Sequence, residues 1–326
     1  MSELGKNVFC RKMNIENKNN DGVCSVSVFQ RPVWVSLFAL TAAVAWGWAY
    51  PLIKMGLVEF GITQQMTGSK MLFAGVRFAI SGLIILAIAS SRHAKFSLRS
   101  RGDWWFVLMF SMFNTTLHYA FFYFGLSHSA GSRAAILNSL SVFVVVLLAC
   151  VFFRSDRLTV RKIVGCVMGA IGIIALNLGG EESGGFTWLG DGMIALNALC
   201  GATAGLLTRP LSRRVDIFVG TGYSLTIGGA LLVVPGVAMG GVLPSITLWG
   251  VVILLLLIGI STVAFTLYNK LLSCNPVGRV AIFNSLIPVV GAVTSCLCLG
   301  EPFYWKYLVA GTLAAGGIYV INQGKK

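Results

Sequence analysis

The sequence predicts an all-α integral membrane protein with ten transmembrane helices, arranged as two inverted five-helix repeats. Three observations support this fold class: few charged residues, regularly spaced apolar segments, and one short motif that occurs twice. Of the 326 residues, 56% are hydrophobic and only 11% are charged, and the mean hydropathy is +0.81. Because soluble domains are about one quarter charged, lipid must cover most of this protein's surface.

Ten segments have the length of about 20 apolar residues that a helix needs to cross a bilayer. They span roughly 34–56, 70–90, 104–126, 131–153, 160–179, 188–208, 217–239, 246–270, 278–299 and 303–322. Continuous apolar runs favour helices over the alternating strands of a membrane barrel. We therefore expect a disordered cytoplasmic tail over 1–33, a first repeat over 34–179 and a second over 180–326.

The distribution of basic residues predicts the orientation. Most of the 25 lysines and arginines precede the first span or follow an even-numbered span. Cytoplasmic loops of membrane proteins carry such an excess, so both termini are expected in the cytoplasm, with the protein in a bacterial cytoplasmic membrane. The net charge of +14 is then a signature of membrane topology, and no nucleic-acid partner is expected.

A repeated motif links the two halves. "RAAILNSL" begins at Arg133 and "RVAIFNSL" begins at Arg279, and six of the eight residues are identical. This spacing pairs the fourth span with the ninth. Because each half contains an odd number of spans, the second half enters the membrane with the opposite orientation. Inverted repeats of this kind let many transporters expose one site to either side in turn.

Three further motifs carry a family resemblance. They are "AWGWAYPLIKMGL" in the first span, "VRFAISGLIILAI" in the second, and "LGEPFYWKYLVAGTLAAGGIYV" at the end. Together with the span number, they resemble the ten-helix EamA-type branch of the drug/metabolite transporter superfamily, over about residues 34–322. The resemblance implies secondary transport of small polar metabolites, often export of amino acids or related compounds.

Polar side chains inside the spans are candidates for substrate binding, because such groups are costly in a membrane. In the first span, Trp46, Tyr50 and Lys54 are spaced four residues apart and share one helix face. The aromatic rings could stack on a flat or cationic substrate, while Lys54 attracts anions at the outer mouth. The alternative is an aromatic belt with a lysine that reaches the interface.

The third span places Asn114 and His118 on one predicted face, with Tyr119 beside them. This face could contact substrate, and His118 could accept a proton because imidazole titrates near neutrality. Hydrogen bonding between helices is the alternative. Arg77 in the second span could bind a carboxylate or only stabilise packing.

The symmetry mates Asn138 and Asn284 are expected to face the bundle interior. They could touch substrate or only support helix packing. We expect these two residues, together with Trp46, Tyr50, Asn114 and His118, to converge on one cavity.

Several classes of chemistry have no signature in the sequence. No acidic residue is predicted near the bilayer midplane, no C-x-x-C occurs, and no G-x-x-x-x-G-K is present for nucleotide phosphates. We therefore expect no cofactor, no metal and no enzymatic activity. Facilitated transport or exchange is expected, or weak proton coupling through His118. The expected partners are a small-molecule substrate and the lipid bilayer, with the chain a monomer or a weak homodimer.

The sequence thus predicts a secondary transporter that moves small polar metabolites by alternating access, with export as the leading direction. An importer or exchanger of a nucleotide-like or cofactor metabolite is the alternative within transport. An intramembrane lipid enzyme or a channel fits the sequence less well, because His118 alone offers catalytic chemistry at membrane depth.

Overall fold

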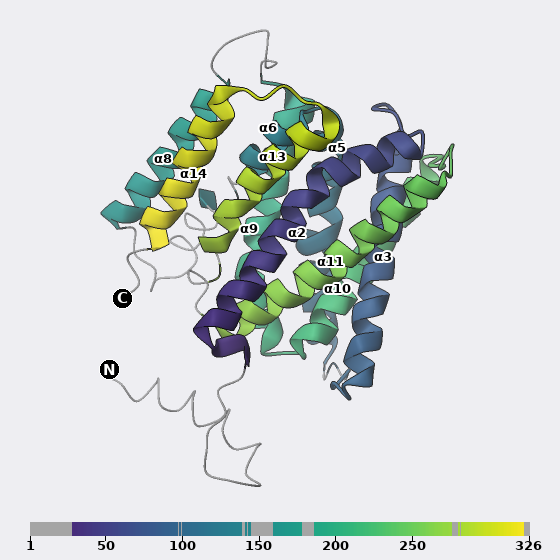
Figure 1. Ribbon diagram of the computed structural model, residues 1–326. Helices are drawn as coiled ribbons and strands as arrows, with labels where there is room; N and C mark the ends of the chain where they lie inside the picture. Colours follow the sequence, from purple (N-terminus) through teal and green to yellow (C-terminus); the bar gives the residue numbers. More distant parts are fainter. Residues whose placement is uncertain are drawn as a thin grey trace, which may run out of the picture.

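The structure is a computed structural model that describes residues 28–96, 98, 100–138, 141, 143, 144, 159–177, 186–275, 280 and 282–322. These residues form a bundle of helices joined by short connections (Figure 1). The first half contains η2 (Val28–Gln30), α2 (Pro32–Glu59), α3 (Thr67–Ser91), α4 (Arg101–Ser111), η3 (Met112–Thr116), α5 (Leu117–Ser127), α6 (Gly131–Asn138) and α8 (Val160–Asn177). The second half contains η5 (Trp188–Gly192), α9 (Met193–Ser212), α10 (Ile217–Ala238), α11 (Leu248–Cys274), η6 (Ile282–Ser285), α13 (Leu286–Leu299) and α14 (Trp305–Asn322).

In each of the ten predicted spans the described residues include helix, which confirms that the fold is helical. The third span consists of α4, the π-helical turn η3 and α5 in one continuous run. Five segments are individually long and apolar enough to cross a membrane: α2, α3, η5 with α9, α10 and α11. Most of the predicted tail, and the fourth span beyond residue 144, lie outside the described residues, as does Arg279. The boundaries and inverted orientation of the two repeats remain predictions.

Local sequence signals place the helix ends. Ser100 forms a capping box with Asp103 at the start of α4, and the Thr247 hydroxyl accepts a hydrogen bond from the Gly250 amide at the start of α11. Such caps satisfy amide groups that have no partner inside the helix. The chain leaves α13 at Gly300, whose φ of 62° lies in the left-handed region that glycine adopts without strain.

The outer surface is apolar and the interior is partly polar, as expected for a protein surrounded by lipid. Large side chains such as Leu248, Leu297 and Trp105 are exposed, whereas Arg77, Asn197 and Ser224 are buried. Exposed tryptophans occur near the starts of α2, α4, η5, α11 and α14. Rings at both ends of the bundle match the aromatic belts of membrane proteins.

The helices pair across the two halves of the chain. Helix α3 packs along α10, α8 along α14, and α6 against α13. Helix α2 packs against α11 and α13, while α9 packs against α5 and also contacts α6. In Figure 1, the α8–α14 pair lies on one side of the bundle and α3 with α10 on the other. Among the described helices, every extensive contact therefore joins one half to the other.

The α3–α10 interface is the closest of these contacts, and glycines create it. Its glycines recur every seven residues on each helix and meet in pairs, which are Gly68 with Gly236, Gly75 with Gly229, and Gly82 with Gly222. A Cβ atom added at Gly75 would lie 2.7 Å from the Gly229 carbonyl oxygen. The two backbones therefore touch, which only small residues permit.

The bundle has two ends, which we name after acidic residues. Helices α3, α6, α9, α11 and α14 begin at the Asp191 end, which is the upper end in Figure 1. Helices α2, α4, α8 and α10 begin at the Asp103 end, which is the lower end in Figure 1.

Candidate functional site

The centre of the bundle contains a row of three hydrogen-bonded side chains from three helices, which we call the central chain. Asn197 of α9 donates to the Asn138 carbonyl oxygen of α6 at 2.6 Å, and Asn138 donates to the Tyr50 hydroxyl of α2 at 2.9 Å. Tyr50 and Asn197 each lie nine residues from the helix end at the Asp191 side. At about 1.5 Å per residue, both are roughly 14 Å deep, near the middle of a bilayer.

A second polar pair involves the symmetry mate of Asn138. Asn284 of η6 donates to the Tyr268 hydroxyl of α11 at 2.7 Å. The Tyr268 ring meets the Trp46 ring of α2 edge to face, with centroids 5.0 Å apart. Both Asn138 and Asn284 thus donate a hydrogen bond to a tyrosine hydroxyl. Because Trp46 and Tyr50 are one helical turn apart on α2, that helix links the two networks.

Aromatic rings fill the space between these networks. Tyr119 of α5 packs on Phe78 of α3 at 4.0 Å between centroids, and on Phe122 and Phe265 at 5.8 and 6.2 Å. Phe122 in turn meets the edge of Tyr50 at 5.4 Å. The rings make a continuous cluster across α2, α3, α5 and α11, which offers flat contact area next to the amide groups.

His118 lies at the α5–α9 interface. Its ring meets Tyr119 at 4.6 Å, and a Cβ atom added at Gly201 of α9 would lie 2.8 Å from its Cε1 atom. The ring also lies beside the backbone of Asn197. Glycine at position 201 therefore makes room for the imidazole next to the Asn197 end of the central chain.

Asn114 and His118 contact different helices, although they are four residues apart. Asn114 is buried against α10 and donates to the Ser224 hydroxyl at 3.0 Å. His118 faces α9 instead. Asn114 lies within the π-helical turn η3 and His118 follows it in α5, and such a turn inserts an extra residue that shifts the helix face. The structure therefore places Asn114 in a packing contact outside the central chain.

Arg77 is also placed apart from the central chain. Its side chain is 1% exposed and donates to the Tyr123 hydroxyl at 3.0 Å, the Ser261 hydroxyl at 2.9 Å and the Leu257 carbonyl oxygen at 3.2 Å. The guanidinium thus ties α3 to α5 and α11. The aromatic cluster around Phe78 and Tyr119 adjoins it, and these three hydrogen-bond acceptors are all neutral groups of the protein.

The Asp191 end is closed by two ion pairs that join the halves. Arg133 of α6 makes a bidentate pair with Asp191 of η5, at 2.9 and 2.8 Å, and both side chains are at most 5% exposed. Lys54 lies 3.3 Å from Glu301, which also accepts a hydrogen bond from the Gly131 amide at 2.8 Å. Lys54 therefore lies at the mouth of the bundle, separate from the central chain.

Two residues of this arrangement were missed by sequence reasoning. Asn197 carries a signal that could have been used, because it is a strongly polar side chain deep inside a predicted span. Asp191 is an acidic residue at the start of its span, and Arg133 begins another span at the same face. Their pairing could have been suggested by position, although periodicity alone does not show that the two helices are neighbours.

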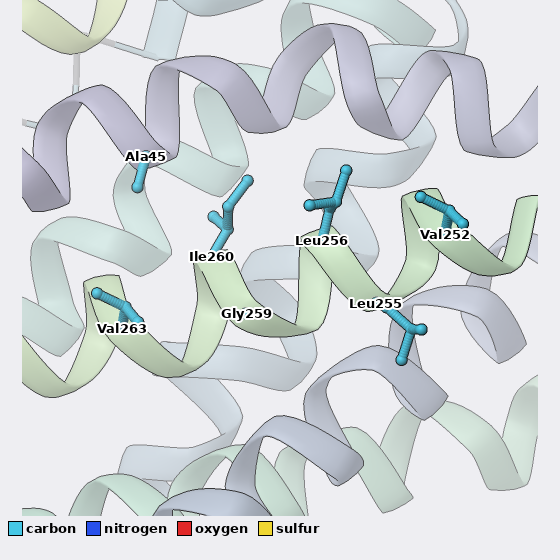
Figure 2. A pocket seen from close by; sticks show the side chains of 7 residues that line it. All are labelled: Ala45, Val252, Leu255, Leu256, Gly259, Ile260 and Val263. Carbon is cyan, nitrogen blue, oxygen red and sulfur yellow. The ribbon is translucent and has the colours of Figure 1, made fainter. Parts of the chain in front are cut away.

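A surface hollow of about 520 Å³ lies elsewhere, between α2 and α11. Figure 2 shows that it is lined by aliphatic groups, among them Ala45, Leu256 and Ile260. Leu255, Leu256 and Val263 are among the large exposed side chains, so this hollow faces the lipid. A binding site for a polar metabolite needs converging polar groups, and the central chain has them, whereas the hollow has aliphatic walls.

The site can offer hydrogen bonds and aromatic surface. Its amides and hydroxyls are neutral, and in the part of the chain that the structure describes no group of three metal-ligating side chains occurs.

The EamA-like transporter family model matches the sequence twice, over residues 33–178 and 188–323. The chain belongs to the EamA-like transporter family. This family lies within the drug/metabolite transporter superfamily, so the family resemblance is confirmed.

Curated relatives of this EamA-like protein carry transporter names. The uncharacterized transporter YvbV of Bacillus subtilis is 26% identical over 294 residues, covering 87% of this chain and 90% of the relative. A probable amino-acid metabolite efflux pump of Salmonella typhimurium is 24% identical, covering 86% and 92%. A solved crystal structure has a TM-score of 0.65 at 21% identity, covers 88% of this chain and 95% of that chain, and shows the same fold.

Proposed function

We propose that this EamA-like transporter is a secondary carrier that exports small polar metabolites, amino acids or related compounds, by alternating access. The observation that carries the proposal is the central chain. One half of the protein supplies Tyr50 and Asn138, and the other supplies Asn197. A site divided between two repeats near the midplane is the arrangement that alternating-access carriers use.

The packing of the helices supports two inverted repeats. If the halves correspond, α2 matches α9, α3 matches α10, α4 with α5 matches α11, α6 matches α13, and α8 matches α14. Exchanging the halves then converts the contacts of α2 with α11 and α13 into those of α9 with α5 and α6, and both sets occur. The pairs α3–α10, α6–α13 and α8–α14 convert into themselves, as a pseudo-twofold axis requires.

The ion pairs at the two ends of the bundle support a state in which the Asp191 end is closed. At the Asp191 end, Arg133–Asp191 and Lys54–Glu301 join the halves in buried or half-buried ion pairs. At the Asp103 end, the pair between Arg214 and Asp103 has an arginine that is 43% exposed. We infer that the Asp191 end, on the outside by the distribution of basic residues, must open by separating these charges.

Export of amino acids is supported by the relative from Salmonella typhimurium, whose name states amino-acid metabolite efflux. Its similarity covers most of both chains, so the corresponding central helices exist in both. Aromatic surface with a few fixed polar groups is suited to a compact metabolite. The neutral central groups favour exchange or downhill transport over an obligatory ion gradient.

Reconstitution into liposomes tests this function. Labelled amino acids should exchange in counterflow, and uptake should proceed down a substrate gradient without an imposed pH gradient. The same panel should include nucleosides, which separate this proposal from an exchanger of nucleotide-like compounds. An absolute requirement for a proton or sodium gradient would contradict downhill transport, and a conductance would indicate a channel.

Single-cysteine labelling tests the inverted orientation. In a cysteine-free background, Ser183→Cys should react from outside the cell and Ser212→Cys from inside. Ser183 lies outside the described residues, between α8 and η5, whereas Ser212 ends α9. Labelling of both positions from the same side would rule out ten spans with inverted halves.

A further inference from the structure

The α5–α9 interface contains two buried polar atoms that have no hydrogen-bond partner among the described residues. They are the Asn197 Oδ1 atom and the His118 Nδ1 atom. The Asn197 side chain is fully buried, and its amide nitrogen is already bonded to Asn138 at 2.6 Å. Because the two amide atoms project in different directions from one carbon, the oxygen is directed away from Asn138.

Reversing the orientation of the amides does not give both polar atoms of Asn197 a protein partner. Asn and Gln oxygens and nitrogens are assigned from the hydrogen bonds that they make. Reversing both Asn138 and Asn197 would let the Tyr50 hydroxyl donate to Asn138, and would leave the Asn197 nitrogen instead. One polar atom of Asn197 stays without a protein partner in either arrangement. Leaving such an atom buried and unpaired is costly, so the position is suited to a bound group.

His118 presents a second polar atom on the same interface. Gly201 follows Asn197 by one helical turn of α9, and a Cβ atom at Gly201 would lie 3.1 Å from the His118 Nδ1 atom. The polar edge of the ring therefore faces the same segment of α9 as Asn197. A nitrogen of a neutral imidazole is either a donor or an acceptor, so His118 and Asn197 together can pair with a partner that carries one donor and one acceptor.

Charge and shape restrict the partner. The charged groups nearest in the bundle are engaged elsewhere: Lys54 with Glu301, Arg133 with Asp191, and Arg77 with Tyr123 and Ser261. The side chains next to Asn197 and His118 are the amide of Asn138 and the ring of Tyr119. An ionised group here would be desolvated with only neutral groups in direct contact among the described partners of Asn197 and His118, which is unfavourable. A flat group would gain contact with the rings.

We propose that Asn197 and His118 recognise an uncharged planar group with adjacent donor and acceptor atoms, namely a carboxamide or a nitrogen heterocycle, on the transported metabolite. This inference rests on the proposed transport function and narrows its substrate class. Among amino acids and related compounds, it selects those distinguished by such a group over those distinguished by a second carboxylate or ammonium.

Ligand stabilisation of the purified full chain tests the inference with matched pairs of compounds. The probes are nicotinamide with nicotinate, uracil with orotate, and benzamide with benzoate, in which each second member carries a carboxylate. At least one neutral member should raise the unfolding temperature, and its anionic counterpart should bind at least tenfold more weakly. Failure of all neutral members, or equal binding of the anions, overturns the proposal.

Variants locate the binding. Asn197→Leu keeps the size of the side chain and removes the amide, so binding of the neutral probe should weaken about tenfold, as loss of a buried hydrogen bond predicts. Gly201→Ala tests the same position independently, because its methyl group must displace the His118 ring. Asn114→Leu is the control, since Asn114 bonds to Ser224 on α10. Unchanged binding in both test variants would mean that only a water bridges these atoms.

The same experiment separates this inference from the transport proposal. Leucine has neither a carboxamide nor a heterocycle. If leucine binds and exchanges as well as glutamine or asparagine, and Tyr50→Phe impairs that exchange, the transport function stands and the recognition group is wrong. If no amino acid exchanges and no probe binds, both proposals fail.

Discussion

The α3–α10 and α5–α9 interfaces each join the two halves of the protein, but they are built differently. Along α3–α10, glycines bring backbone against backbone, and an added Cβ atom at Gly82 would lie 2.4 Å from the Thr226 amide nitrogen. Along α5–α9, larger side chains meet, and Asn197 and His118 keep polar atoms without a protein partner. The first interface is dominated by close backbone packing, with one unpartnered hydroxyl at Thr226, whereas the second places unpartnered polar atoms on two facing helices. We infer that the first interface mainly supports the fold and that the second is the better candidate for ligand binding.

The two interfaces should respond differently to substitution. Substitutions in the α3–α10 interface should lower the free energy of unfolding and leave the ligand contacts intact. Substitutions in the central chain next to α5–α9 should lower transport with little effect on stability. The ion pair between Arg133 and Asp191 is an exception. It lies at the end of the polar region, but its role is structural, because it fixes the start of η5 and α9.

The largest effect on stability is expected for Asp191→Ala. The change leaves the Arg133 guanidinium buried without its bidentate carboxylate partner. Removing one member of a buried ion pair costs about 3–5 kcal/mol, measured here as the free energy of unfolding from SDS titration in mixed micelles. The double variant Arg133→Met/Asp191→Leu is the control and should lose less, since no unpaired charge remains. Equal losses in the single and double variants would contradict this account.

A smaller but clear loss is expected for Gly75→Leu, which forces α3 and α10 apart. Its Cβ atom would lie 2.7 Å from both the Gly229 carbonyl oxygen and the Val233 amide nitrogen. Overpacking of this kind costs about 1–3 kcal/mol. Gly259→Leu is the matched control, because no described atom lies within 4 Å of a Cβ there and the position lines the lipid-facing hollow. If both variants are equally stable, the glycine interface is not closely packed.

Tyr50→Phe should affect transport much more than stability. The variant removes the hydroxyl that accepts a hydrogen bond from Asn138 and keeps the ring contact with Phe122. Hydrogen bonds between membrane helices contribute about 0.6 kcal/mol on average, so the change in unfolding free energy should be near that value. Counterflow of the substrate should fall about tenfold. Tyr223→Phe, whose ring packs against Trp104 and Phe96 away from the central chain, should transport normally.

The smallest effect is expected for Asp103→Ala at the opposite end of the bundle. Its partner Arg214 is 43% exposed, so water and salt screen this ion pair. Exposed ion pairs contribute little to stability, and the capping box with Ser100 that is also lost is exposed, so the unfolding free energy should fall only slightly and counterflow should stay close to wild type. A loss as large as that of Asp191→Ala would show that the two ends do not differ in the way described.

Sequence reasoning located the helices well because membrane crossing imposes a simple physical requirement. A run of about 20 apolar residues must satisfy all of its backbone hydrogen bonds internally, so it forms a helix whatever its neighbours are. The helices found among the described residues of the predicted spans follow from that requirement. The repeated Arg-Asn-Ser motif also led to Asn138 and Asn284, which both hold tyrosine hydroxyls.

The chemical environment of each polar residue could not be obtained in this way. Periodicity places Asn114 and His118 on one face, but the π-helical turn η3 directs one to α10 and the other to α9. The sequence also provides no means of finding the neighbour of Asn197, because helix pairing depends on the shape of whole interfaces. Lipid is as apolar as the helix surfaces, so close packing and hydrogen bonds select the partners.

The sequence by itself therefore determined the membrane environment, the helix positions, the family and most of the candidate polar residues. Hydropathy and spacing are properties of single segments, and they survive without knowledge of the fold. Only the tertiary structure decided that Asn197 completes the central chain, that Arg77 is occupied by neutral protein groups, and that Asp191 pairs with Arg133. These are contacts between segments distant in sequence, and they exist only where helix packing brings specific atoms within hydrogen-bonding distance.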